Sequence, residues 1–442
     1  NTKRPQPELN GFVMNKSKLN VAVIGLGTVG SGVIKLLRKQ KNNIKKRTGI
    51  ELKVVAVSAK NRRKQRSVDI SPFRWIASPI TIAKDPDVDV IVELIGDMDN
   101  TARKIIIEAI NNGKHVVTAN KSLLAKEGSI FEELAKEKGV YLRYEAAVAG
   151  GIPIIKVLQD SLIVNKISKL YGVINGTCNF ILTKMESEGR EYQDVFSEAK
   201  QLGYVESDPR LDIGGIDSAH KLALLSCLAF GTSLNFKAVK TEGIDHISIE
   251  DIQEADLIGY KIKLLATAEY SKNMLKQEVS PKLIRKSSPI AQVNGSTNII
   301  AIEGEEIGTT VFSGPGAGMG PTASSVVSDL VAIASRKSKS TFLNGDKKNG
   351  SKRDDSVSKK SSFYLRFILK DKPGVIARLS GKLGSFGISI NQMKQKPHPK
   401  QKATLIMTTH KTLRNNLEKA LTDIMKLKIC EQRPICIEIQ EV

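Results

Sequence analysis

Residues 19–34, LNVAVIGLGTVGSGVI, decide how the first part of the chain folds. The apolar run LNVAVI contains the β-branched residues typical of a buried strand, and an apolar helical pattern follows the glycines. GxGxxG between a strand and a helix is typical of the phosphate-binding turn in dinucleotide-binding βαβ units. Gly25 permits the tight turn, Gly27 lets the backbone approach a pyrophosphate, and Gly30 lets the helix pack on the strand.

The alternation of strands and helices continues beyond this turn. We expect strands at 51–58, 89–95, 115–118 and 139–145, and helices at 100–112 and 127–138. This pattern predicts a Rossmann-type doubly wound parallel sheet over residues 19–150, an α/β fold class. From about residue 146, glycine-rich turns, strands and long helices indicate an α+β catalytic and dimerisation domain over 151–335, whose last helix packs back on the Rossmann domain.

The two ends of the chain differ in composition from this central part. Residues 1–18 are polar, and we regard them as a disordered or tag-like N-terminus. Residues 336–361 are rich in Lys, Ser, Asn, Gly and Asp, which is typical of a disordered basic linker. Residues 362–442 form a βαββαβ pattern, with strands expected at 362–369, 388–395, 402–409 and 434–440 and helices at 374–386 and 412–426.

The positive charge of the chain is confined to a few segments. Lys and Arg number 68 against 46 Asp and Glu, a net charge of +22. Residues 35–47, 60–66 and 336–361 carry most of this excess. Aromatic residues make up only 5% and do not interleave the two basic runs before residue 67, whereas nucleic-acid binders combine positive charge with stacking side chains. We therefore expect no nucleic-acid partner.

Several absences in the sequence bear on the compartment. No apolar run reaches the roughly 18–20 residues that span a bilayer, so no membrane is expected. The first 18 residues lack the apolar segment of a signal peptide. Four scattered cysteines (Cys178, Cys227, Cys430 and Cys436) do not suggest a disulfide framework. These features predict a cytoplasmic protein.

The end of the second strand bears on cofactor choice. An NAD site usually has an acidic residue here for the ribose 2′-hydroxyl, but this chain has Arg62, Arg63 and Lys64. These cations would attract a 2′-phosphate, which favours NADP over NAD, and the alternative is a solvated basic loop. Lys121 follows the strand at 115–118, where ligands of open α/β sheets bind, although its spacing also fits a surface lysine.

The stretch from Gly203 to Cys227 has the most specific pattern of charged residues. Asp217 and Lys221 are four residues apart on an expected helix, and they share an apolar stripe with leucines. Burial would lower the pKa of the lysine, so that it could act as an acid or base near neutral pH. The alternative is an ordinary salt bridge. His220 lies about 100° around the helix from Lys221, and we interpret it as structural.

Taken together, these residues resemble homoserine dehydrogenase in its form with a C-terminal ACT domain. The ordered motifs that carry the resemblance are GLGTVG (25–30), ELIG (93–96), GKHVVTANK (113–121), AVAGGIPIIK (147–156), GVINGTCNFIL (172–182), LGYVESDPRLDIGGIDSAHKL (202–222) and GPGAGMGPTASSVVSDL (314–330). The resemblance implies reversible NAD(P)H-dependent reduction of L-aspartate 4-semialdehyde to L-homoserine, in threonine, methionine and isoleucine biosynthesis. It also implies a homodimer or homotetramer.

The resemblance assigns roles to individual residues. It implies that Lys221 protonates the nascent alkoxide with support from Asp212, that Glu206 and Asp217 bind the substrate, and that Lys121 lies between cofactor and substrate. The remaining implied positions are Thr177 and Gly203 for substrate, Leu26, Thr28, Val29 and Gly318 for cofactor, and Glu145, Val148, Gly150 and Ile152 for a monovalent cation such as Na⁺.

The sequence departs from the family pattern after Gly96, where Asp97 replaces a second glycine. This carboxylate would either alter cofactor affinity or be irrelevant to it, with Asp99 or Asn100 capping the following helix.

In the ACT-like part, the Asp-x-Pro-Gly turn exposes backbone N–H groups suited to an amino-acid carboxylate. The expected effector is threonine, and the expected contacts are Asp371, Gly374, Val375, Ile388 and Asn391. An ACT fold that only oligomerises is the alternative.

Two other functions are compatible with parts of the sequence. Cys178 could be the nucleophile of an acylating semialdehyde dehydrogenase, but no histidine is tied to it by sequence, which favours a small buried residue. A Rossmann domain joined to an ACT domain could also be a nucleotide-sensing regulator. The set of Glu206, Asp217 and Lys221 argues against a protein without catalytic activity.

Overall fold

The computed structural model describes residues 17–96, 100–205, 208–335, 360–399 and 402–442. Asp97, Asp99, Glu206 and the predicted linker up to residue 359 lie outside these ranges. The chain divides into two compact units, the first comprising 1–170, 220–237 and 302–350 and the second 171–219, 238–301 and 351–442. Each unit is described by itself.

The first unit contains the parallel sheet that the sequence predicts. Its strands are β1 (Lys18–Ile24), β2 (Glu51–Ser58), β3 (Arg74–Trp75), β4 (Val90–Glu93), β5 (His115–Thr118) and β6 (Leu142–Arg143). They follow the order β3-β2-β1-β4-β5-β6, and each neighbouring pair is parallel. The order reverses direction between β1 and β4, so the doubly wound Rossmann-type prediction is confirmed.

Helices connect these strands, and two predicted boundaries are wrong. The helices are α1 (Thr28–Thr48), α2 (Pro79–Lys84), α3 (Thr101–Asn111) and α4 (Lys121–Glu137). The helix expected from residue 127 begins at Lys121, because the Asn120 side chain accepts a hydrogen bond from the Leu123 N–H and caps the helix there. The strand expected at 139–145 shortens to β6, because a 3₁₀ turn begins at Glu145.

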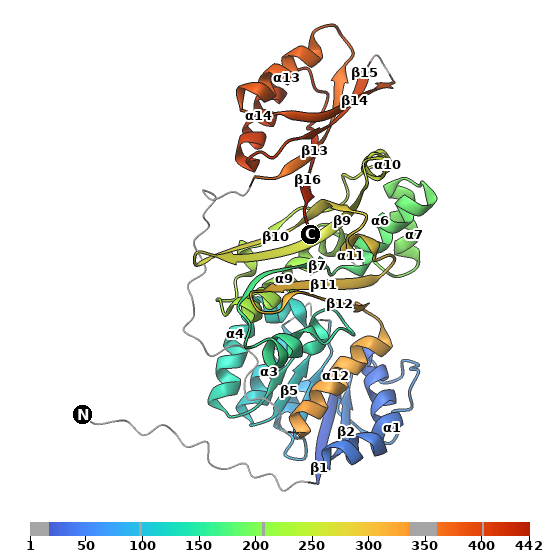
Figure 1. Ribbon diagram of the computed structural model, residues 1–442. Helices are drawn as coiled ribbons and strands as arrows, with labels where there is room; N and C mark the ends of the chain where they lie inside the picture. Colours follow the sequence, from blue (N-terminus) through green and yellow to red (C-terminus); the bar gives the residue numbers. More distant parts are fainter. Residues whose placement is uncertain (1–16, 97–99, 206–207, 336–359, 400–401) are drawn as a thin grey trace, which may run out of the picture. The chain divides into compact units, whose positions relative to one another are not determined.

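A late helix, α12 (Met319–Ala334), completes the core of the first unit. It packs along α1 (Figure 1), and Val326 and Leu330 join Val33 and Leu37 in one buried apolar cluster. A Cβ at Gly32 would lie 2.6 Å from the Met319 side chain, so the close approach of the two helices requires glycine there. The first unit also contains the 3₁₀ helix η1 (Glu145–Ala147), the short helices α5 (Ile154–Lys156) and η2 (Val157–Ser161), and strand β12 (Gly308–Pro315).

The second unit combines helices with a long hairpin. Strands β9 (Tyr260–Ser271) and β10 (Met274–Arg285) are antiparallel over their whole length. The helices are α6 (Gly176–Glu188), α7 (Tyr192–Gln201), α8 (Pro209–Ile213), α10 (Ile249–Leu257) and α11 (Pro289–Gln292). Three elements contain residues of both units: β7 (Ile167–Val173), α9 (Ile216–Phe230) and β11 (Thr297–Gly304).

The C-terminal residues form the predicted βαββαβ module. Its elements are β13 (Ser362–Lys370), α13 (Val375–Ser385), β14 (Ile390–His398), β15 (Lys402–Thr409), α14 (Arg414–Lys426) and β16 (Ile435–Gln440). Phe363, Phe367, Leu379 and Leu417 belong to its buried core. Strand β16 pairs antiparallel with β13 and parallel with β10 (Figure 1), so the module continues the sheet of the second unit.

The last two residues of the predicted linker, Lys360 and Ser361, lie within the described residues. Ser361 forms a β-bridge with Thr412 inside the C-terminal module, and its hydroxyl donates a 2.6 Å hydrogen bond to Glu438 on β16. Among the described residues, no helix combines the length and apolar composition needed to cross a membrane.

Candidate cofactor and substrate sites

The glycine turn lies where the strand order of the parallel sheet reverses. Gly25 has a φ of +96°, and a Cβ there would lie 2.4 Å from the Leu94 carbonyl oxygen, just after β4. A Cβ at Gly30 would lie 2.0 Å from the Gly25 carbonyl oxygen, whereas one at Gly27 would meet nothing within 4 Å. Gly25 and Gly30 are therefore required by packing, and Gly27 faces the open space that a phosphate group needs.

The loop after β2 presents cations to solvent. Arg62 and Arg63 are exposed, and the Arg62 guanidinium lies 5.9 Å from the centre of the Trp75 ring. Arg66 braces the loop because it donates hydrogen bonds to the carbonyls of Arg62 and Lys64, at 3.0 and 2.8 Å. The loop is connected to the glycine turn through β2, since the Gly25 N–H donates to the Ser58 carbonyl at 2.9 Å.

Glu93 joins the carboxyl ends of β4 and β5. In the sequence it stands only as the first residue of the ELIG motif. Its side chain is fully buried and accepts hydrogen bonds from the Thr118 hydroxyl and the Ile95 N–H, each at 2.6 Å. Lys121 follows at the first position of α4 and is half-buried. Asp99 and Asn100 are the two predicted caps of α3. Asp99 lies outside the described residues, and Asn100 occupies the N-cap position but makes no side-chain capping hydrogen bond.

Gly318 lies at the N-terminus of α12 with a φ of +109°. Its neighbour Met319 contacts Gly32, one turn into the helix that follows the glycine turn. The first unit thus brings Gly318 close to the dinucleotide turn, although about 290 residues separate them in the sequence.

The four residues implied for a monovalent cation lie around the turn after β6, and Glu145 is 2% exposed. Its carboxylate accepts hydrogen bonds from the N–H groups of Ile155 and Lys156, at 2.9 and 3.0 Å. Burial and the nearby Asp329 carboxylate raise the pKa of Glu145 to about 7. Asp329 is also buried, and it pairs with Lys156 at 2.9 Å.

The backbone of this turn is unusual. Ala149 and Gly150 have φ values of +53° and +52° in succession, and the Gly150 carbonyl accepts a 2.6 Å hydrogen bond from the Ser325 hydroxyl. A Cβ at Gly150 would lie 2.5 Å from the Gly316 carbonyl oxygen. The described residues contain no group of three or more His, Cys, Asp or Glu side chains that could hold a metal ion. A cation held mainly by backbone carbonyls would not require such a group.

The substrate residues implied by the resemblance lie near the start of α6, the end of α8 and the start of α9. The Asn175 side chain donates to Asp212 Oδ1 at 3.0 Å and to Asp217 Oδ2 at 2.9 Å. Both aspartates are 4% exposed. Lys221 follows Asp217 by one turn on α9 and is 9% exposed, so the charged residues predicted to be buried on this stripe are buried.

Thr177 and Gly203 are also brought together. The Thr177 hydroxyl, in the first turn of α6, donates a 2.8 Å hydrogen bond to the carbonyl of Tyr204, the residue after Gly203. Gly203 ends α7 in the left-handed region, with a φ of +74°. Glu206 lies outside the described residues.

Cys178 and His220 have the structural roles expected from the sequence. Cys178 is fully buried, and its Sγ lies 3.2 Å from the Asp212 carbonyl oxygen. His220 is 5% exposed and its ring lies 4.3 Å from that of Phe236, centre to centre. Cys178 is therefore not exposed to an incoming aldehyde in the way that an acylating nucleophile would be.

The residues predicted to bind an effector differ in their exposure. Gly374 caps α13 with a φ of +84° and Asp371 is exposed, as an open turn requires. The side chains of Val375 and Ile388, however, belong to the buried apolar core of the module. Asn391 lies in the wall of a cavity of about 250 Å³ between the C-terminal module and the β9–β10 hairpin.

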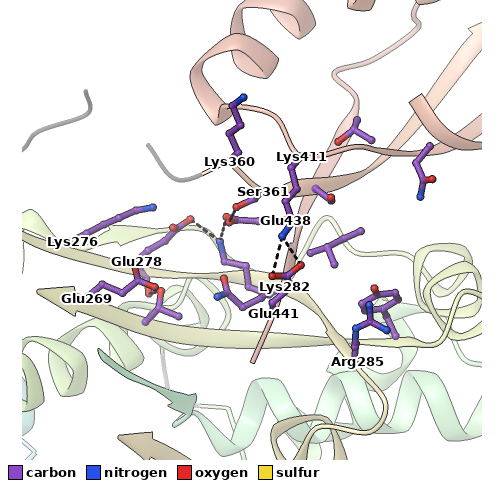
Figure 2. A pocket seen from close by; sticks show the side chains of 17 residues that line it. Glu269, Lys276, Glu278, Lys282, Arg285, Lys360, Ser361, Lys411, Glu438 and Glu441 are labelled. Carbon is purple, nitrogen blue, oxygen red and sulfur yellow. Dashed lines mark hydrogen bonds and ion pairs between the residues drawn. The ribbon is translucent and has the colours of Figure 1, made fainter. Parts of the chain in front are cut away.

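Figure 2 shows this cavity and the buried charges beside it. Lys282 of β10 is 1% exposed and pairs with Glu438 of β16 at 2.6 Å and with Glu278 at 3.3 Å. Arg414 approaches Glu278 at 3.3 Å and Glu438 at 3.5 Å. Although burial alone would raise the pKa of Glu278, Lys282 and Arg414 lower it to about 2. We call Lys282, Glu278, Glu438 and Arg414 the junction cluster.

A second buried ion pair joins the module to α10. The Arg366 guanidinium on β13 binds Asp251 with two hydrogen bonds of 2.6 and 2.9 Å, and the Tyr364 hydroxyl donates to the same carboxylate at 3.0 Å. Burial of the Tyr364 hydroxyl and the neighbouring Asp251 charge raise the pKa of this tyrosine. Asp251 also accepts from Ser248, which completes the capping box of α10.

Comparison with known proteins divides the chain into three consecutive parts. Three family profiles match: "Homoserine dehydrogenase, NAD binding domain" over residues 25–145, "Homoserine dehydrogenase" over 153–331, and "ACT domain" over 363–428. A homoserine dehydrogenase of Pseudomonas aeruginosa is 38% identical over 96% of this chain and 99% of its own. One of Bacillus subtilis is 35% identical over 94% of this chain and 96% of its own.

Solved structures give the same result. The crystal structure of a homoserine dehydrogenase from Thiobacillus denitrificans matches with a TM-score of 0.89 and 39% identity, over 96% of this chain and 98% of that one. A hyperthermophilic archaeal homoserine dehydrogenase in complex with NADPH matches with a TM-score of 0.63 and 26% identity, over 73% of this chain and 99% of that one.

Proposed function

This chain belongs to the homoserine dehydrogenase family, and from that premise we propose that it catalyses the reversible reduction of L-aspartate 4-semialdehyde to L-homoserine. One observation carries the proposal beyond family membership. Asp212 near the end of α8 and Asp217 at the start of α9 are both buried and bridged by Asn175, and the buried Lys221 follows Asp217 by one turn. A carboxylate such as Asp217 can bind an ammonium group, which the semialdehyde carries at its α-carbon.

Each charged residue then has a role in the reaction. Asp217 and Glu206 bind the α-ammonium group, Asp212 supports Lys221, and Thr177 and Gly203 help to shape the substrate pocket. A bound nicotinamide cofactor supplies a hydride to the aldehyde carbon. The Lys221 ammonium donates its proton to the carbonyl oxygen as negative charge develops there, and the lysine becomes neutral. The family relationship and the burial of Asp217 and Lys221 support these roles.

The cofactor is bound by the first unit, and we infer that NADP is preferred over NAD. Gly25, Leu26, Gly27, Thr28, Val29 and Gly30 would cradle the pyrophosphate at the start of α1, with Gly318 and Lys121 nearer the nicotinamide. The open space in front of Gly27 fits this group. Exposed Arg62 and Arg63 after β2 favour a 2′-phosphate.

We also propose that a monovalent cation such as Na⁺ binds near Glu145, Val148, Gly150 and Ile152. A buried carboxylate whose pKa is raised to about 7 would be stabilised by an added positive charge. The successive positive φ values of Ala149 and Gly150 turn backbone carbonyls in directions that a regular helix does not offer. Such a cation would fix the turn and carries no step of the reaction.

The ACT domain suggests regulation, and we propose feedback inhibition by an amino acid, with threonine as the first candidate in a threonine, methionine and isoleucine pathway. The strand pairing of β16 with β10 supports a route to the substrate residues. Val279 of β10 would touch a Cβ placed on Gly215 at 3.0 Å, and Gly215 lies between Asp212 and Asp217 in the sequence.

The proposed assembly is a homodimer or homotetramer in the cytoplasm.

The test is a comparison of NADPH and NADH as reductants of aspartate semialdehyde, with homoserine identified as the product. We expect turnover with both and a higher kcat/KM with NADPH, and we expect added threonine to lower the rate. Absence of homoserine with either cofactor would contradict the proposed reaction. Undiminished rates with each of the 20 amino acids would contradict regulation alone.

A further inference from the structure

We propose that a cavity lined by α6, α10 and β14 is the site at which the amino-acid effector binds, an inference that rests on the proposed regulation. The cavity has a volume of about 670 Å³, within the usual range for small-molecule sites. Strand β14 belongs to the C-terminal module, whereas α6 and α10 belong to the central part of the chain. None of the five effector residues expected from the sequence lines this cavity.

Two lysines of β14 offer donors for a carboxylate group. The Lys394 ammonium binds both oxygens of Glu254, at 2.9 and 3.0 Å, and Lys396 pairs with the same carboxylate. Lys396 also reaches Glu250 at 3.8 Å. Glu254 is 4% exposed, whereas the Lys394 side chain is 49% exposed. Because each ammonium carries three N–H donors, the two lysines can bind a ligand carboxylate without releasing Glu254.

Two other carboxylates in the wall can bind an ammonium group. Glu186 on α6 pairs with Lys261 at 2.9 Å, and Asp256 on α10 pairs with Lys286 at 2.5 Å. The lining contains as many anionic as cationic side chains: Glu186, Glu254 and Asp256 against Lys261, Lys394 and Lys396. A zwitterion adds one charge of each sign and keeps this balance, which favours an α-amino acid over a phosphate or a metal cation.

The same cavity has an apolar surface. Leu257, the last residue of α10, lines it and is 70% exposed. Ile252 of the same helix also lines it. A ligand side chain with a methyl group would cover Leu257 and gain from its removal from water. Threonine, isoleucine and methionine each carry such a group, whereas glycine and aspartate do not.

Helix α6 connects the cavity to the substrate residues. Thr183 and Glu186 in its later turns line the cavity, and Thr177 lies in its first turn. Helix α10 packs on α6 and is bound to the C-terminal module through the pair of Asp251 and Arg366. A ligand held by β14 on one element and by α6 on another would fix α6 relative to the module. The effector would therefore act on the helix that carries Thr177.

Threonine binding to the full-length protein, and inhibition by it, test the site. Lys394→Met removes one donor to the ligand carboxylate, while Glu254 keeps its pair with Lys396, so the fold should be retained. We expect the Kd for threonine, measured by isothermal titration calorimetry, and the half-inhibitory concentration to rise about tenfold, the scale of one charge-assisted hydrogen bond. Without threonine, kcat and KM for aspartate semialdehyde should stay within about twofold of the wild-type values.

A second variant and a matched control accompany this measurement. Leu257→Glu changes an exposed residue and places a charge where the ligand methyl group would lie, so it should also weaken threonine binding about tenfold. Lys382→Met is the control, because Lys382 lies on α13 of the same module, outside the cavity, and pairs with Asp423 at 3.6 Å. It should leave the binding and inhibition by threonine unchanged.

Wild-type affinity for threonine in both cavity variants, or an equal loss in the Lys382→Met control, would overturn the cavity as the effector site. Loss of binding in Asp371→Asn alone would place the effector at the Asp371–Gly374 turn instead, and the proposed regulation would stand. If none of the 20 amino acids binds or inhibits the wild-type protein, the proposed regulation fails, and this inference fails with it.

Discussion

Two buried groups of charged residues in the second unit are bridged by different kinds of donor side chain. At the substrate site, Asp212 and Asp217 share the neutral donor Asn175. In the junction cluster, Lys282 lies between Glu278 and Glu438 (Figure 2), and Arg414 approaches both glutamates. The junction cluster provides cations for its anions from within the protein. At the substrate site a neutral amide bridges two carboxylates, and Lys221 follows Asp217 by one turn on α9.

This difference separates structure from function. Burying charge is costly unless it is paired, so a cluster whose charges are matched internally serves to hold elements in register. Here the elements are β10 and β16, one from each side of the boundary between the central domain and the ACT domain. Substitutions in the junction cluster should therefore change stability, whereas substitutions around the aspartate pair should change catalysis.

Loss of the proton donor should give the largest effect. Lys221→Met keeps the length of the side chain but removes its acidic proton, and we expect kcat to fall about 1,000-fold, within the usual range for general acid catalysis. NADPH binding, measured by fluorescence titration, should be unchanged. A kcat within threefold of the wild-type value would break the distinction, because the buried lysine would then be structural.

In the junction cluster, Lys282→Met should lower the free energy of unfolding by about 3–5 kcal/mol, since it leaves Glu278 and Glu438 with one cation fewer in a buried site. The matched control is Lys282→Met combined with Glu278→Gln and Glu438→Gln, which removes three of the four charges together, leaves Arg414 its pair with Glu418 at 3.0 Å, and should recover much of the loss. Urea unfolding measures the difference. A fall in kcat under conditions where the variant remains folded would show that the junction cluster takes part in catalysis.

Acid should affect the junction cluster in a defined pH range. The pKa of Glu278 is lowered to about 2 in the folded protein, below its ordinary 4.5, so its stabilisation is present above pH 4.5 and is lost as pH falls towards 2. The shift corresponds to at most about 3 kcal/mol. Unfolding free energies of wild type and Glu278→Gln, measured from pH 7 to pH 3, should converge at low pH. Parallel curves would contradict the pairing.

A third, exposed group of charges gives the smallest expected effect. Arg62 and Arg63 face solvent, so Arg62→Ser with Arg63→Ser should leave stability within about 0.5 kcal/mol. The ratio of kcat/KM for NADPH to that for NADH should fall about tenfold, the scale of one charge-assisted hydrogen bond. Steady-state kinetics with both cofactors checks this, and an unchanged ratio would mean that the loop is only solvated.

The fold was largely predictable from the sequence, because its signals are local. The strand, glycine turn and helix from residue 19 onwards, and the βαββαβ pattern from 362, depend on periodicity and turn residues within a few positions. The start of α4 was missed although its cap was visible as Asn120, and β6 was predicted too long because Glu145 turns inward to cap α5.

The candidate site was only partly predictable, because its connections are long-range. Asp217 and Lys221 could be selected from their spacing on one helix. Asn175 could not, since it reaches its aspartates across 37 and 42 residues, and Asp329 reaches the Glu145 N–H across 184. A useful signal for Asp329 was present, however, in the form of an acidic residue within the otherwise apolar and small-residue pattern of α12.

The central claim is that Asp217 binds the ammonium group of the substrate. The most direct measurement compares kcat/KM for aspartate 4-semialdehyde with that for 4-oxobutanoate, which lacks only the amino group, in wild type and in Asp217→Asn. We predict that the wild type prefers the amino substrate at least 1,000-fold and that Asp217→Asn loses most of this preference. Equal kcat/KM values for both aldehydes in the wild type would contradict the account.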